Sequence, residues 1–390
     1  MSVPGWLRAD PSAPGWRVPV VAWAASRALI LLLGLVLSLW FGLPTRGVDP
    51  AVPHQMALLG GWDTTWYLDI ARHGYTTDTA DVGQVFTNLA FFPLLPGVMA
   101  AFLAIGVNPF WGALAVANLA MLVALWALHA LTRARAGERA AAAATWTLAL
   151  FPPALYCSLP YTEGIAVAAA IGAALLAVRG RFAIAGLVAG VAALTRPTGA
   201  LVALLVGLLA LYRPAPGRLR RLAAAVLPAI VAVGCFLGWM AAERGSALLP
   251  LDAQKAWDRG QVGVGIVTEL PREIGAGWDL VASATFTAAW HATLRDLAFL
   301  GLYAWLLVLL WRREGGLRSP WVVYSAAALL IPLSSGTITS TARFGLMAFP
   351  LMWPLADRVA ALDPRRRAWL VAGAVAVIAL GVAQLTMRSP

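Results

Sequence analysis

The stretch F-F-P-L-L-P-G-V-M-A-A-F-L-A-I, residues 91–105, decides how this chain is threaded through a membrane. It is shorter than the roughly 20 apolar residues that a helix needs to cross about 30 Å of hydrocarbon. Pro93 and Pro96 interrupt helical hydrogen bonding near its start. If this run does not cross, every later loop lies on the opposite side from the one it would otherwise occupy. We expect an interfacial or re-entrant helix here.

The composition predicts a polytopic membrane protein. Hydrophobic residues make up 61% of the 390 residues and charged residues 12%, against about 25% charged residues in soluble domains. This argues against a soluble globular chain and against disorder. The net charge of +11 does not indicate a DNA-binding protein, because the charged residues are too few to form a basic surface for DNA. Cys157 and Cys235 lie in apolar runs and indicate no disulfide framework.

Eleven apolar runs are the expected spans when 91–105 is not counted as a crossing. They are 18–43, 110–131, 140–157, 161–178, 182–195, 199–212, 222–242, 292–311, 320–333, 344–360 and 368–387. The first is longer than the core of a signal peptide, so we expect a span there and no cleaved leader.

The basic residues orient these spans. With a cytoplasmic N-terminus, the six inner segments contain 18 of the 29 Lys and Arg residues, in agreement with the positive-inside rule. These segments are 1–17, 132–139, 179–181, 213–221, 312–318 and 357–367. Counting 91–105 as a crossing would put the basic loops outside.

This threading predicts an all-α polytopic membrane protein with about 11 transmembrane helices and two long outer-face loops, 44–90 and 243–291. We expect a single membrane domain overall. Its residues 1–242 form a first module with the first outer loop, and 243–390 contribute the second outer loop and the C-terminal helices. In this threading, the charged and polar residues that we consider as candidate site residues below all fall on the outer face.

The most informative of these residues lie in G-W-D-T-T-W-Y-L-D-I-A-R-H-G-Y, residues 61–75. Asp69 is spaced to pair with Arg72 (i, i+3) or with His73 (i, i+4) on a helix. The alternative is an interfacial amphipathic helix whose aromatic residues sit at the lipid headgroups. That alternative explains Asp63 less well, because interfacial anchoring uses aromatic and basic residues and not an acid.

Three further charged residues lie in short outer turns. Glu163 follows L-P-Y-T, and an acid at membrane depth is a candidate functional residue unless it only caps a helix. Arg196 and Arg343 are the only basic residues of their turns. A guanidinium group matches the oxygens of an anionic headgroup, although both could also snorkel to ordinary lipid phosphate.

Two other segments contain candidate binding residues. In one a polar residue precedes helix-breaking prolines, and in the other a polar residue lies near a tryptophan. Asn88 opens N-L-A-F-F-P-L-L-P, whose prolines can leave backbone groups facing a cavity. Gln254 and Trp257 are i, i+3 neighbours in P-L-D-A-Q-K-A-W-D-R, an arrangement suited to sugar recognition, although an amphipathic lid helix would have the same pattern.

No phosphate-binding glycine loop, zinc-ligand cluster or Ser-His-Asp arrangement is evident. We therefore assign no metal and no cofactor, although Asp63 and Glu163 could share a divalent ion. The absence of a nucleotide-binding module favours an activated donor that is carried on a lipid.

In chain order, the 61–75 motif, N-L-A-F-F-P-L-L-P, S-L-P-Y-T-E-G and A-L-T-R-P-T-G resemble the PIG-V-like mannosyltransferases of the GT-C superfamily. The A-Q-K-A-W-D-R and A-R-F-G-L-M-A-F-P segments are also similar, so the resemblance covers about residues 60–355. It implies a GT-C-type bundle with an extracytoplasmic active site in the plasma membrane. It also implies an inverting mannosyltransferase that uses a polyprenyl-phosphate-linked mannose and a glycan, lipid or protein acceptor.

On this resemblance, Asp63 would be the catalytic base, and Arg196 and Arg343 would hold the donor phosphate. The predicted substrate-binding residues are Trp62, Asp69, His73, Tyr75, Asn88, Glu163, Arg196, Gln254, Trp257 and Arg343. The alternative function is a polytopic transporter or flippase for a lipid-linked or small solute, which would place ionisable residues near the bilayer midplane.

Overall fold

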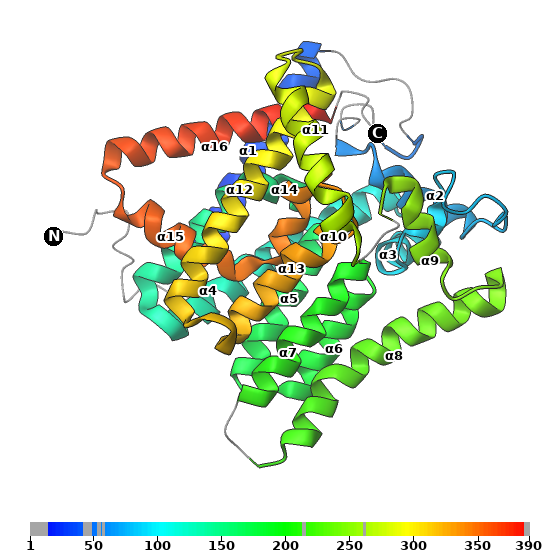
Figure 1. The fold of residues 1–390 in the computed structure, drawn as a ribbon, viewed down its shortest axis with the longest axis horizontal. Helices are drawn as coiled ribbons and strands as arrows, with labels where there is room; N and C mark the ends of the chain where they lie inside the picture. Colours follow the sequence, from blue (N-terminus) through cyan, green and yellow to red (C-terminus); the bar gives the residue numbers. More distant parts are fainter. Residues whose placement is uncertain are drawn as a thin grey trace.

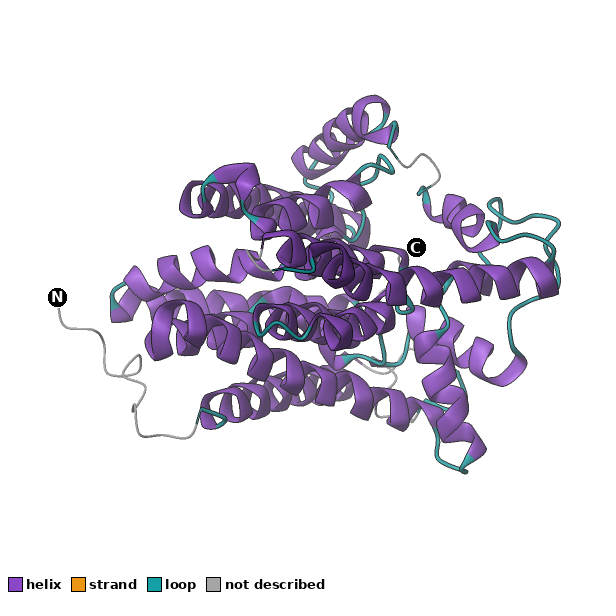
Figure 2. Cartoon of the chain, turned by 90° about the horizontal axis from the view of Figure 1, so that it is seen from below, coloured by secondary structure: helices purple, strands orange, loops and turns teal. Residues whose placement is uncertain are grey.

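The chain folds into packed helices joined by short turns and a few longer loops, in a computed structural model (Figures 1 and 2). The structure describes residues 15–41, 49–52, 56, 59–212, 216–259 and 263–385. Within these ranges there is no β-strand, only an isolated bridge between Val82 and Val85. All the predicted site residues lie in the described part.

The helices, in chain order, are α1 (Arg17–Phe41), α2 (Asp63–His73), α3 (Leu94–Ala104), α4 (Pro109–Leu150), α5 (Glu163–Val178), α6 (Phe182–Ala193), α7 (Leu201–Tyr212), α8 (Arg218–Arg244), α9 (Leu249–Asp252), α10 (Gly265–Thr268), α11 (Leu270–Ala282), α12 (Ala288–Glu314), α13 (Pro320–Leu333), α14 (Thr341–Phe344), α15 (Met352–Ala361) and α16 (Pro364–Gln384).

The helices confirm the prediction of a polytopic, all-α membrane protein. In the described ranges, five are long and apolar enough to cross a bilayer, namely those that begin at Arg17, Pro109, Arg218, Ala289 and Pro364. A sixth span would combine Pro152–Ser158 with α5, which are bent by 105° relative to each other. Several shorter apolar helices pack between them, so the count of eleven spans stays a prediction.

α4 is a helical hairpin and not one straight rod. Gly137 interrupts it with φ 82° and ψ 176°, a conformation that favours glycine. His129 contacts Thr145 through Nδ1 at 3.2 Å and Glu138 through Nε2 at 2.9 Å. Residues 16 positions apart in a straight helix would be about 24 Å apart. The chain therefore turns back at Gly137, and the predicted spans 110–131 and 140–157 lie side by side.

The decisive stretch 91–105 forms the short helix α3. Its 11 residues extend about 16 Å, roughly half the hydrocarbon thickness. Leu95 and Met99 of α3 are fully buried in an apolar cluster with Leu68 of α2 and Phe110 of α4. α3 therefore fastens α2 to one end of the α4 hairpin, and α2, α3 and α9 lie together on the right of Figure 1.

The main core is made of closely packed helices rich in alanine. Its largest apolar cluster draws residues from α1, α4–α8, α12, α13 and α15. Small side chains allow helix backbones to approach one another closely. α8 lies against α6 in this way, and a Cβ atom at Gly186 of α6 would be only 2.0 Å from the carbonyl oxygen of Ala224 of α8.

This contact predicts that Gly186→Ala destabilises the bundle, by about 1–3 kcal/mol, because backbone cannot move aside as a flexible side chain can. Gly172→Ala in α5 is the matched control, since a Cβ atom there meets no atom within 4 Å and alanine favours helix. Thermal unfolding in detergent should show a lower midpoint for Gly186→Ala only. Equal midpoints for the two variants would contradict the close packing of α6 and α8.

Candidate functional site

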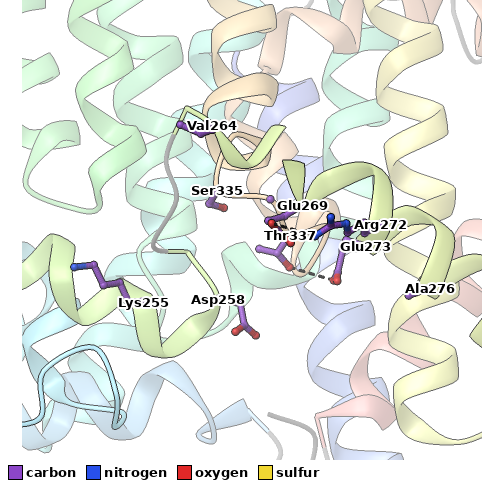
Figure 3. A pocket seen from close by; sticks show the side chains of 10 residues that line it. Lys255, Asp258, Val264, Glu269, Arg272, Glu273, Ala276, Ser335 and Thr337 are labelled. Atoms are coloured by element: carbon purple, nitrogen blue, oxygen red, sulfur yellow. Dashed lines mark hydrogen bonds and ion pairs between the residues drawn. The ribbon is translucent and has the colours of Figure 1, made fainter. Parts of the chain in front are cut away.

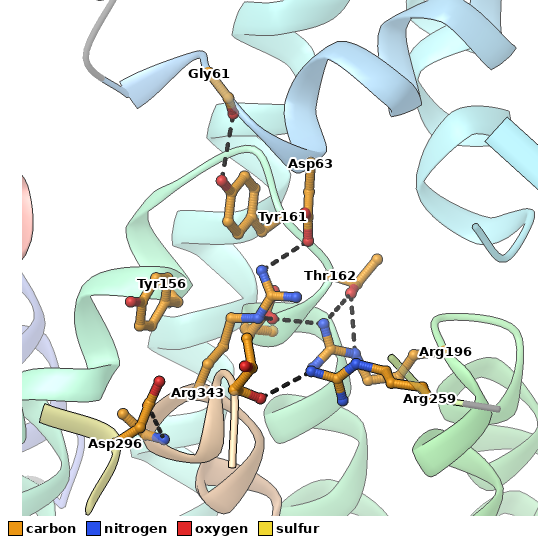
Figure 4. Close-up of polar contacts among 12 residues, drawn as sticks. Gly61, Asp63, Tyr156, Tyr161, Thr162, Arg196, Arg259, Asp296 and Arg343 are labelled. Atoms are coloured by element: carbon orange, nitrogen blue, oxygen red, sulfur yellow. Dashed lines mark hydrogen bonds and ion pairs between the residues drawn. The ribbon is translucent and has the colours of Figure 1, made fainter. Parts of the chain in front are cut away.

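Four charged side chains from distant parts of the sequence meet at one end of the bundle and form an ion chain. Asp63 Oδ2 lies 2.7 Å from Arg343 Nη1, and Arg343 Nε lies 3.0 Å from Glu163 Oε1. The same Glu163 oxygen accepts a hydrogen bond from Arg196 Nη2. Figure 4 shows Asp63, Arg343 and Arg196 of this ion chain pointing toward one another. The sequence analysis predicted all four as site residues, and the structure brings them together.

Asp63 is presented by a tight turn at the beginning of α2. Trp62, the residue before it, has φ 61° and ψ −125°, a backbone conformation that non-glycine residues rarely adopt. Such strain persists only where the surroundings impose it, and it concentrates at functional sites. The carbonyl oxygen of Gly61 accepts a hydrogen bond from the Tyr161 hydroxyl at 3.3 Å. The strained turn is thereby tied to the segment that carries Glu163.

Glu163 is the most deeply buried member of the ion chain, with 1% of its surface exposed. It is the first residue of α5, directly after the break that bends this helix away from Pro152–Ser158. Its neighbour Thr162 accepts hydrogen bonds from Nε and Nη2 of Arg196 at 3.2 and 3.0 Å. A buried carboxylate is stable only when it is paired, and here two guanidinium groups share it.

Arg343 is positioned by Asp296, a buried acid of α12 that was not predicted as a site residue. The Asp296 carboxylate accepts hydrogen bonds from the backbone amides of Ser340 at 3.0 Å and Ala342 at 3.1 Å. The Tyr303 hydroxyl donates to the Ala342 carbonyl at 2.8 Å. Burial lowers the pKa of Arg343, but the carboxylates of Asp63 and Glu163 outweigh burial and raise it above its ordinary value.

Arg259 is a third guanidinium group at this centre. It lies over the Phe344 ring at 4.4 Å and donates through Nη2 to the Thr339 carbonyl at 2.8 Å. No carboxylate forms an ion pair with it among the described residues. Burial, and then the positive charges of Arg343 and Arg196, lower the pKa of Arg259 to about 10. The centre therefore combines three guanidinium groups with two carboxylates and has an excess of positive charge.

Asp69, His73 and Asn88 form a separate polar cluster. Asp69 accepts from Asn88 Nδ2 at 2.7 Å and contacts His73 Nδ1 at 3.0 Å, which confirms the expected i, i+4 pairing. The expected alternative partner, Arg72, pairs instead with Asp49 at 2.7 Å. Asn88 also accepts from the amide of Thr76 at 3.0 Å. Within the described ranges, no hydrogen bond or ion pair joins this cluster to the ion chain.

The other predicted binding residues, Gln254, Trp257, Tyr75 and Trp62, lie in loops near α2. Gln254 Nε2 donates to the Ala90 carbonyl at 2.8 Å, and the Trp257 ring lies 4.7 Å from the Phe86 ring. The Tyr75 hydroxyl donates to the Phe91 carbonyl at 2.8 Å. These contacts fasten residues 253–257 to 86–91. Trp62 remains exposed beside Asp63. A direct role in substrate binding stays a prediction for each of them.

No group of three His, Cys, Asp or Glu residues that could hold a metal ion occurs in the searched, described part of the chain. Arg343 contacts both Asp63 and Glu163, so the two acids are bridged by a guanidinium group. The bridge uses Oδ2 of Asp63 and Oε1 of Glu163, whereas the buried Oε2 of Glu163 has no hydrogen-bond partner in the described part of the chain.

The comparisons with known proteins reveal a likeness of fold. No protein-family model matches the sequence, and no curated protein matches it either. The crystal structure of ArnT from Cupriavidus metallidurans bound to undecaprenyl phosphate aligns with a TM-score of 0.50 at 16% identity, over 94% of this chain and 76% of that chain. The fold is of the GT-C type.

Oligosaccharyltransferases of Archaeoglobus fulgidus also align. AglB in complex with an inhibitory peptide and a dolichol-phosphate gives a TM-score of 0.48 at 15% identity, over 94% of this chain. The aligned part spans 56% of the AglB chain, so this chain corresponds to about half of that protein.

The shared carboxylate predicts that Glu163→Gln strongly destabilises the protein. Removing one partner of a buried ion pair costs about 3–5 kcal/mol because it leaves uncompensated charge, and here it affects Arg196 and Arg343 together. Asp252→Asn is the control, since its ion pair with Lys255 is exposed and contributes little. Thermal unfolding in detergent should separate the two variants clearly. A Glu163→Gln midpoint equal to the control's would contradict the ion chain.

Proposed function

We propose that this chain is an inverting glycosyltransferase that takes a sugar from a polyprenyl-phosphate-linked donor. The observation that supports this most directly is the convergence of Asp63 with Arg196, Arg259 and Arg343 in a GT-C-type fold. A carboxylate suits proton transfer, and guanidinium groups suit a phosphate. The solved structure of ArnT, which shares this fold, contains undecaprenyl phosphate.

The excess positive charge is where the donor phosphate would bind. Arg196 is held by Thr162 and Glu163, whereas Arg259 contacts a backbone carbonyl and a ring and pairs with no carboxylate among the described residues. A phosphate there would relieve the repulsion among the three guanidinium groups. In a partly dry site, fixed charges stabilise the negative charge that develops on the leaving phosphate better than water does. Arg259 and Arg343 are the proposed phosphate ligands.

Asp63 is the proposed general base, and its partner Arg343 controls when it can act. While the pair holds, Arg343 occupies Oδ2 of Asp63, an oxygen that could otherwise accept the proton. A donor phosphate would compete for Arg343 and weaken this pair. Asp63 then accepts the proton of the acceptor hydroxyl, whose oxygen attacks the anomeric carbon while the bond to the phosphate oxygen breaks. Attack from the face opposite the leaving group inverts the anomeric centre.

The donor sugar and the location complete the proposal. Mannose, and membership of the PIG-V-like family, rest on the sequence motifs around Asp63, Glu163 and Arg196. A plasma-membrane location, a cytoplasmic N-terminus and an extracytoplasmic site rest on the distribution of Lys and Arg. The acceptor would be a glycan, lipid or protein.

The transporter or flippase alternative has weaker support. Asp63 and Glu163 each begin a helix, α2 and α5, and the short helix α14 carries Arg343 beside them. The charged groups thus gather where helices begin and turns meet, and Asp63, Glu163, Arg196 and Arg343 are held in fixed ion pairs. A transport pathway would instead call for ionisable residues near the bilayer midplane, between two related halves.

Asp63→Asn tests the base. It keeps the shape of the side chain but cannot accept the proton, so sugar transfer from polyprenyl phosphomannose should fall about 10²–10⁴-fold. Asp81→Asn, an exposed acid of the same outer loop, is the control and should transfer normally. The measurement is product formation in membranes supplied with labelled donor. Near-wild-type transfer by Asp63→Asn would refute the assigned base.

Arg259→Gln tests the phosphate ligand. We expect weaker binding of unsugared polyprenyl phosphate by about tenfold or more, because hydrogen bonds to charged groups contribute about 1.5–3 kcal/mol. Arg244→Gln is the matched control, since Arg244 also donates to a backbone carbonyl, that of Tyr75, and lies over a ring, that of Trp239. Binding to protein in nanodiscs provides the measurement. Equal losses in both variants would reject Arg259 as a specific ligand.

A further inference from the structure

A cleft of about 880 Å³ lies between the second outer loop and the turn after α13 (Figure 3). Its walls are formed by residues around 255–258 and 264–276 on one side and by residues 335–337 on the other. Sites for small molecules usually measure about 300–1,000 Å³, so this volume is at the upper end of that range. The ion chain residues do not line it.

The lining carries three acidic and two basic side chains together with hydroxyl groups. Lys255 and Arg272 face Asp258, Glu269 and Glu273 around the cleft. The hydroxyl groups of Ser335 and Thr337 add donors and acceptors, whereas the apolar side chains are only those of Val264 and Ala276. A phosphate would meet three carboxylates against two cations here, in contrast to the arginine-rich centre.

The two walls of the cleft are packed against each other, so their relative position is fixed by contacts within the fold. The amide of Gly263 donates to the Ser334 carbonyl at 3.0 Å. A Cβ atom on Gly336, which has φ 95°, would be 2.6 Å from Cβ of Glu269. Beneath them, Leu270, Leu333 and Ile338 form a buried apolar cluster.

The cleft is connected directly to the charged centre. Asp258 lines the cleft, and the next residue, Arg259, lies over Phe344 beside Arg343. Arg259 also donates to Thr339, two residues beyond the cleft residue Thr337. A ligand held in the cleft would therefore have one end near the group that we propose as the phosphate ligand.

We propose that this cleft binds the saccharide part of the acceptor, as a neutral, hydroxyl-rich compound. Sugar hydroxyls both donate and accept, so they match a wall on which carboxylates alternate with an ammonium and a guanidinium group. This assignment rests on the proposed glycosyl transfer and adds the class of acceptor to it. It places acceptor and donor recognition in two chemically different sites that meet at Arg259.

The test uses Glu273→Gln and Arg272→Gln in the full-length protein, reconstituted in nanodiscs. Both residues are on the surface and lie outside the ion chain. Arg366→Gln is the matched control, because Arg366 pairs with Asp363 at i, i+3 just as Arg272 pairs with Glu269, and the two arginines are 78% and 81% exposed. The probes are polyprenyl phosphomannose as donor and a lipid and glycan extract of a strain lacking the gene as acceptor.

A neutral saccharide predicts that both cleft variants raise the KM for the extract about tenfold, whereas the KM for the donor and that of the control stay unchanged. Opposite effects of the two variants would indicate an anionic ligand and overturn the proposal, as would an unchanged KM for the extract. If the wild-type protein transfers no sugar, the proposed function fails and the acceptor site with it. If the wild type transfers sugar and the variants behave like it, only the cleft assignment fails.

Discussion

The structure depends on the ion chain in which Arg343 joins Asp63 to Glu163 and Glu163 joins Arg343 to Arg196. Each member would be unfavourable alone in a buried or half-buried position, because an unpaired charge loses its hydration. Paired, they can be satisfied only when the turn before α2, the start of α5, the turn before α7 and α14 all meet. The ion chain therefore specifies how these turns converge, beyond what packing of small apolar side chains requires.

The same arrangement makes the site responsive to an anion. Arg343 divides its guanidinium group between two carboxylates, and Arg259 adds a charge that no carboxylate of the described residues pairs with. Relieving that repulsion requires negative charge from outside the chain. A phosphate that supplies it also competes for Arg343. In the proposed mechanism, donor binding and the release of Asp63 from its ion pair would be linked in this way through Arg343.

Much of the fold could be predicted from the sequence because hydropathy and helix breakers are local signals. Residues 91–105 were expected to be a short helix, and α3 has that length. Asp63, Glu163, Arg196 and Arg343 could be singled out because each is a charged residue in an apolar outer turn. Arg259 and Asp296 could not, since their importance lies in contacts with the turn at 339–342, which no local pattern reveals. Asp296 did carry one signal, an acid inside an expected span.

The pairing of Asp63 with Arg343 has a consequence for selectivity. A base that was always free could activate water whenever a donor approached and release the sugar uselessly. In the proposed mechanism, Asp63 stays paired with Arg343 until an anion draws Arg343 away, and the neighbouring cleft, with more acidic than basic side chains, offers such an anion no competing site. The phosphate would thus bind where its arrival frees the proposed base. The strained turn at Trp62 holds Asp63 beside Arg343, where this competition would take place.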